Sequence, residues 1–106
     1  MTKVSFDLRQ TGYKKLTVMG HSGYSEAGSD IVCAAISSSL NMAAAVLDKS
    51  GTEYKQSIGK TSVIIELADT AAPVGQYVMA ALHQELEALS ESYPNNLKVT
   101  VAERFR

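Results

Sequence analysis

Apolar and polar residues alternate in the first part of the chain, and this pattern predicts two short β-strands. Val4, Phe6 and Leu8 alternate with polar neighbours, and the alternation returns at Leu16 after a turn around Gly12. A period of two places every second side chain on the same face of a strand. The two segments therefore predict a β-hairpin with one buried face, whose second strand ends at Gly20.

Apolar residues at three- and four-residue spacing predict two helices. The first covers about residues 30–49, with Asp30 or Ser29 as its N-cap and Gly51 as its C-terminal cap. The second has Pro73 in its first turn and stops at Tyr93-Pro94. Their apolar stripes are Val32, Ile36, Leu40, Ala43 and Leu47 in the first helix, and Val78, Leu82, Leu86 and Leu89 in the second.

Three further segments have strand character. Residues 53–58 and 60–67 flank a turn at Gly59, and apolar residues alternate again over residues 97–101. The predicted order is strand-strand-helix-strand-strand-helix-strand. This order predicts a two-layer α+β domain, with a mostly antiparallel sheet of about five strands and both helices on one face. We expect residues 1–106 to form this single domain.

Composition narrows the function classes. The formal net charge is −1, so the basic surplus typical of nucleic-acid-binding proteins is missing and we expect no direct nucleic-acid partner. No run of about 18 apolar residues occurs, and the N-terminus lacks the apolar core of a signal peptide. These features predict a cytoplasmic protein without a membrane segment. One cysteine and two histidines exclude an internal disulfide and are too few for a Cys-rich structural zinc site.

The candidate reactive residues lie between Gly20 and Ser37. His21 follows a strand end, and Cys33 lies in the predicted first turn of a helix, after a loop rich in glycine and serine. The partial positive charge at a helix start favours a thiolate, and so does a neighbouring imidazolium. A Cys/His pair is a common way to activate a thiol for attack on a carbonyl. Asp30 can cap the helix or orient a partner group, and Ser37 shares a helix face with Cys33.

A structural interpretation of the same residues stays open at this point. Free cysteine is among the most buried residue types, so Cys33 can be core filler in a non-catalytic, ribosome-associated or partner-binding domain. His21 can be an ordinary surface histidine. We expect the second histidine, His83, on a solvated helix face, where Glu85, Glu87 and Glu91 form an exposed acidic surface.

Two short motifs resemble the signature of the ribosomal-processing cysteine protease family (Prp). They are Gly-His-Ser-Gly at residues 20–23 and Gly-Ser-Asp-Ile-Val-Cys-Ala-Ala-Ile-Ser at residues 28–37. The family pattern has alanine in place of Ser22. The similarity extends to the total length, the element order and the Tyr93-Pro94 pair that ends the second helix.

The resemblance implies a cysteine endopeptidase without a cofactor or metal. Family members remove a short N-terminal extension from a large-subunit ribosomal protein, the twenty-seventh in the usual count. They cleave after a Phe-Phe pair, support ribosome assembly and act as homodimers. The catalytic residues of the family fall on Cys33 and His21, and its supporting or substrate-binding positions fall on Gly20, Asp30 and Ser37.

Overall fold

The computed structural model describes residues 1–20 and 30–104. The strands are β1 (Thr2–Arg9), β2 (Gly12–Met19), β3 (Tyr54–Ile58), β4 (Ser62–Leu67) and β5 (Leu97–Arg104). The helices are α1 (Ile31–Ser50) and α2 (Pro73–Ser92). The predicted order of elements is therefore confirmed.

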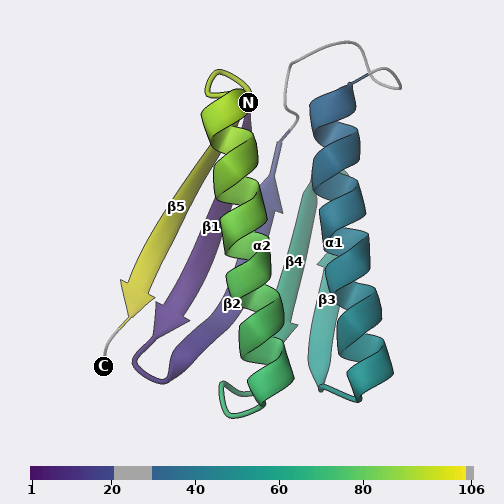
Figure 1. The fold of residues 1–106 in the computed structure, drawn as a ribbon, viewed down its shortest axis with the longest axis vertical. Helices are drawn as coiled ribbons and strands as arrows, with labels where there is room; N and C mark the ends of the chain where they lie inside the picture. The colour runs from purple at the N-terminus through teal and green to yellow at the C-terminus, as the bar shows by residue number, and fades with distance from the viewer. Residues whose placement is uncertain (21–29, 105–106) are drawn as a thin grey trace.

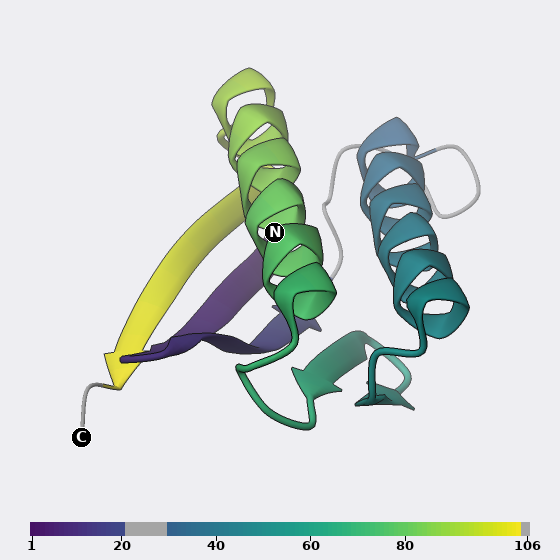
Figure 2. The same cartoon turned by 60° about the horizontal axis from the view of Figure 1, so that its bottom comes forward.

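The five strands form one sheet in the order β3-β4-β2-β1-β5. Strands β1 and β5 are parallel, and the other three pairs are antiparallel. Both helices cover the same face of the sheet (Figures 1 and 2). Helix α1 lies over the β3–β4 side, and α2 lies over the β1–β5 side (Figure 1). The predicted two-layer α+β class, with a mostly antiparallel sheet, is confirmed.

The hydrophobic core lies between the helices and the sheet. Each predicted helix stripe contributes to it, because a helix with apolar residues at three- and four-residue spacing presents them on one side. Helix α2 buries a wider stripe than the pattern predicted, since Met79 is also fully buried. The largest fully buried side chains are Phe6, Leu16, Leu47, Ile65, Leu67, Met79, Leu86 and Leu97.

Helix α1 is long and apolar enough in composition to cross a membrane, a test that core helices of globular domains also pass. In this fold its stripe from Val32 to Leu47 packs into the core. Gly51 ends the helix with a φ of 70°, in the left-handed region that favours glycine, and its N–H donates to the carbonyl of Asp48. The predicted C-terminal cap is confirmed.

The prediction that His83 lies on a solvated helix face is wrong. Its ring packs on Phe6, with ring centroids 4.6 Å apart, and its side chain is 23% exposed. Nδ1 lies 2.9 Å from the Tyr13 hydroxyl, and Nε2 lies 3.2 Å from Oε1 of Glu87. The physical reason is that β1 and β2 bring aromatic rings to the flank of α2, which the helix pattern alone does not reveal.

Candidate active site

The site is built at the start of α1, where Asp30 is the N-cap. One carboxylate oxygen of Asp30, Oδ1, accepts hydrogen bonds from the N–H groups of Val32 and Cys33, each at 3.0 Å. Asp30 itself is buried, and its backbone is extended at φ −77° and ψ 101°. These bonds satisfy amides that a helix start leaves without partners. The predicted cap is confirmed, and it fixes the position of the cysteine backbone directly.

Cys33 lies in the first turn of α1 and is half-buried. It stands beside the core stripe and is not a member of it, because the stripe runs through Val32 and Ile36. A cysteine that only filled the core would lie on that stripe. The position combines partial access with a backbone fixed by the cap, and both suit a nucleophile.

Ser37 follows Cys33 by one helical turn and is exposed on the same side of α1. Farther down that side, the Tyr54 hydroxyl donates to Oδ1 of Asp48 at 2.7 Å, and the carbonyl oxygen of Ala44 lies 3.5 Å from the same hydroxyl oxygen. The first residue of β3 is therefore held against the C-terminal half of the helix side that also carries Cys33 and Ser37.

The first-turn amides of α1 are largely in use. The N–H groups of Val32 and Cys33 bind the Asp30 side chain, and that of Ala34 donates to the Asp30 carbonyl at 3.1 Å. The amide of Ile31 is the first-turn donor that takes no part in these bonds. An oxyanion held at the helix start would have to use that amide or a donor from another segment.

Gly20 lies at the end of β2 and is tied to the β3–β4 turn. Its N–H donates to the carbonyl of Thr61 at 2.8 Å. Its φ is +90°, and a Cβ atom there would lie 2.8 Å from the carbonyl oxygen of Met1. Backbone strain and a close contact thus both require glycine at this motif position.

The predicted base, His21, lies outside the described residues, as does the rest of the predicted loop to residue 29. Of the predicted site residues, the structure places Cys33 and Ser37 on α1 and Asp30 at its N-cap. It places Gly20 at the neighbouring strand end. The assignment of His21 stays a prediction.

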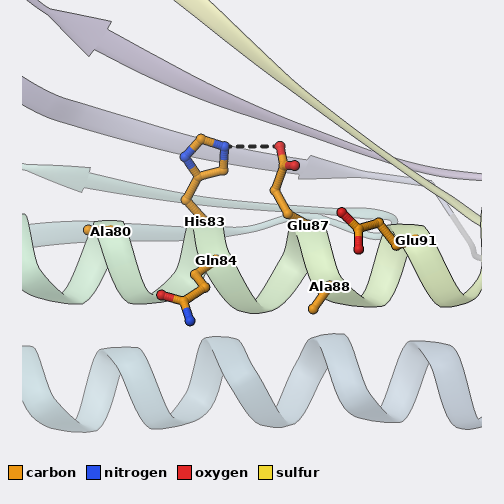
Figure 3. A pocket seen from close by; sticks show the side chains of 6 residues that line it. All are labelled: Ala80, His83, Gln84, Glu87, Ala88 and Glu91. Carbon is orange, nitrogen blue, oxygen red and sulfur yellow. Dashed lines mark hydrogen bonds and ion pairs between the residues drawn. The ribbon is translucent and has the colours of Figure 1, made fainter.

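The other histidine belongs to a structural cluster on α2. His83 and Glu87 project from the same side of α2 and are joined to each other, whereas Gln84 projects to the other side (Figure 3). They line an open groove along the helix together with Ala80, Ala88 and Glu91. Burial, and then the charge of Glu87, raise the pKa of the Tyr13 hydroxyl that contacts His83. Within residues 1–20 and 30–104, no group of three or more His, Cys, Asp or Glu side chains is arranged to hold a metal.

Apolar side chains are exposed at the end of the molecule where α1 begins. Met19 ends β2 and is 55% exposed, Ile31 begins α1 and is 54% exposed, and Ile58 ends β3 and is 74% exposed. Sequence reasoning did not single out these residues, because their exposure depends on how the strands and helices assemble. The only sequence signal is an isoleucine at the end of the otherwise polar run Lys55-Gln56-Ser57.

A family model described as cysteine protease Prp matches residues 1–98. The chain belongs to this family. It is also 30% identical over 84 residues to the ribosomal processing cysteine protease Prp of Mycoplasma genitalium. The aligned residues cover 79% of this chain and 84% of that relative.

Solved structures show the same fold. The Prp protease of S. aureus with a covalently linked product peptide has a TM-score of 0.92 and 20% identity, over 96% of this chain and 100% of the other. The same protease with a substrate peptide gives a TM-score of 0.86 at 19% identity, with the same coverage. A Streptococcus mutans protein gives 0.81 at 21% identity, over 98% and 96% of the two chains. The chain is therefore a member of the ribosomal-processing cysteine protease family, and the resemblance seen in its motifs is confirmed.

Proposed function

We propose that this protein is a cysteine endopeptidase that removes the N-terminal extension of the twenty-seventh large-subunit ribosomal protein, cleaving after a Phe-Phe pair. One observation carries the proposal. The single cysteine of a chain in the Prp family lies half-buried in the capped first turn of α1, beside the core stripe. Exposed apolar residues at the same end of the molecule suit a substrate with aromatic side chains.

The proposed mechanism uses Cys33 as nucleophile and His21 as base. His21 takes the thiol proton, and the sulfur attacks the carbonyl carbon of the second phenylalanine to form a tetrahedral oxyanion. The oxyanion collapses, the peptide C–N bond breaks, and the imidazolium gives its proton to the leaving amine. A water molecule then attacks the thioester carbonyl and gives a proton to His21. The C–S bond breaks, the product leaves with its new carboxyl group, and the imidazolium returns its proton to the Cys33 sulfur.

Asp30, Gly20 and Ser37 have supporting roles in this proposal. Asp30 fixes the backbone of Cys33 through the cap bonds, and Gly20 fixes the strand end that precedes His21 in the sequence. Ser37 is exposed one turn from Cys33, where it can donate a hydrogen bond to a bound peptide.

The proposal includes a cytoplasmic homodimer. A shallow apolar groove between the two helices supports a subunit contact there, since Met42 and Val46 line it and are 68% and 39% exposed. Sedimentation of the wild type and of Met42→Glu at several protein concentrations tests this. A wild type that is a monomer at every concentration contradicts it.

The proposed function is tested by incubating the protein with a peptide that spans the Phe-Phe junction and measuring product masses. The wild type should release one product pair, cut after the second phenylalanine. Cys33→Ala should release none, and His21→Ala should be slower by about 10²- to 10⁴-fold. A wild type that binds the peptide without cutting it would instead favour a non-catalytic binding domain.

A further inference from the structure

We propose that the substrate peptide binds as an added strand along the free edge of β3, with Ile58 contacting one of its apolar side chains. This inference rests on the proposed function, because it assigns the peptide-binding surface of that same site. The backbone pattern of β3, its start against α1 and the exposure of its last residue support this binding mode.

The hydrogen-bond register of the β3–β4 hairpin shows which backbone groups of β3 point outward. Gly59 N–H donates to the carbonyl of Ser62 at 2.8 Å, and Ala68 N–H donates to the carbonyl of Glu53 at 3.0 Å. Hydrogen-bonded and non-hydrogen-bonded positions alternate along an antiparallel pair. Between these two ends, Lys55 and Ser57 therefore face β4 with their N–H and C=O groups.

The intervening residues, Tyr54, Gln56 and Ile58, direct their N–H and C=O groups away from β4. Strand β3 is the last strand on its side of the sheet, and no other strand within residues 1–20 and 30–104 takes up these groups. Three outward-facing residues in alternation form a template for one extended peptide.

The template leads toward the nucleophile. Tyr54 is level with Ala44 and Asp48 of α1, because its hydroxyl group donates to the Asp48 side chain and lies 3.5 Å from the Ala44 carbonyl oxygen. Ile58 lies farther along β3, about 13 Å at 3.3 Å per residue. Since α1 runs in the opposite direction at 1.5 Å per residue, this distance corresponds to about nine helix residues. Ile58 is therefore level with about Ser37, one turn from Cys33.

The end of the template is apolar. Ile58 is 74% exposed, and it ends a strand whose three preceding residues are polar. Its side chain lies on the helix-covered face of the sheet, since it is paired with Val63, which packs against the core. An aromatic side chain of a peptide at this edge would cover Ile58 just before the chain reaches Cys33. Extended peptides expose their scissile bond, so strand addition also presents the peptide in a form that a thiolate can attack.

Amide hydrogen exchange on the Cys33→Ala protein, with and without the Phe-Phe peptide, tests this directly. The amides of Tyr54, Gln56 and Ile58 should exchange more slowly when the peptide is present. The amides of Lys55 and Ser57 serve as internal controls, because β4 already binds them. Peptide binding that leaves the three outward amides unprotected overturns the proposal. Protection that depends on protein concentration and not on peptide shows that a second copy covers the edge, and it also overturns it.

Kinetics of two matched variants separate this inference from the proposed function. Ile58→Ser should lower kcat/KM by about tenfold, mainly through KM, because apolar contact is lost. Val101→Ser, at an exposed apolar position of the other edge strand, should leave kcat/KM unchanged. Equal kcat/KM for Ile58→Ser and the wild type overturns the edge-binding proposal while the protease function stands. A wild type that protects the three amides but does not cleave keeps the binding mode and overturns the function.

Discussion

The two helices of this protein have the same length and cover the same sheet face, yet their polar residues have different environments and roles. Helix α1 begins at a buried aspartate that fixes a half-buried cysteine, and it has no acidic residue in its first turn. Helix α2 begins at Pro73 without a side-chain cap and carries His83 in its middle. Both nitrogens of that histidine have partners within the fold. The place of a side chain in the fold, and not its residue type alone, decides which of the two is the candidate for chemistry.

The largest expected effect separates Cys33 from His83. Cys33→Ala should lower peptide cleavage by at least about 10³-fold, because the nucleophile is removed, while alanine is well accepted in a helix. His83→Gln should keep wild-type turnover at the same temperature. Cleavage rates on the Phe-Phe peptide and circular dichroism melting curves measure both. Equal loss of turnover in the two variants would show that the difference between the helices is wrong.

A smaller effect concerns the stability that His83 provides. His83→Ala should lower the free energy of unfolding by about 1–2 kcal/mol, because it removes the ring contact with Phe6 and leaves the half-buried Tyr13 hydroxyl without its partner. Urea unfolding of the wild type and the variant provides the measurement. Unchanged stability would mean that His83 is a solvated residue after all.

Substitutions at the N-caps of the two helices should change the free energy of unfolding in opposite directions. Asp30→Ala should cost about 1 kcal/mol of unfolding free energy and lower kcat, because the backbone of Cys33 loses its anchor. Asp30→Asn keeps an oxygen acceptor and should recover most of the stability. Ala72→Asp adds a cap to α2 and should stabilise the fold by a few tenths of a kcal/mol to about 1 kcal/mol, without changing kcat. Urea unfolding and initial rates measure the set, and Asp30→Ala with normal kcat would remove the link between cap and catalysis.

The smallest expected effect is a pH dependence at the α2 cluster. The pKa of Tyr13 is raised, by burial first and by Glu87 second, so the folded state holds the hydroxyl proton more tightly than the unfolded state does. This contribution to stability is complete below the unfolded pKa of about 10 and is lost as the pH rises through the folded pKa. Tyr13→Phe should therefore flatten the loss of stability above about pH 10. Thermal melts from pH 8 to 11 test this, and parallel curves for the two proteins would contradict it.

The sequence predicted the elements well because each has its own period and boundary residues. Asp30, Gly51 and Pro73 act locally, and local rules placed them correctly. Strand order was not predicted, because alternation shows which face is buried and not which strand is the neighbour. The parallel pairing of β1 with β5 depends on that order, and the environment of His83 depends on where α2 lies over the sheet.

The candidate site divides in the same way. Its position at the start of a helix follows from short motifs, and the structure adds the two cap bonds to Asp30 and the half-buried state of Cys33. The free edge of β3 and the exposure of Ile58 are properties of the assembled sheet. The sequence of β3 does not predict that its last residue lies near the level of Cys33 on α1.

The central claim is that Cys33 attacks the bond after a Phe-Phe pair, and covalent labelling tests it most directly. A peptide that ends in Phe-Phe with a chloromethyl ketone should alkylate the wild type once, as the Cys33 sulfur displaces chloride. Digestion and mass spectrometry should place the label on Cys33, and the uncleaved Phe-Phe peptide should slow the labelling. Labelling that is no faster than with an Ala-Ala analogue, or that persists in Cys33→Ala, would contradict the account.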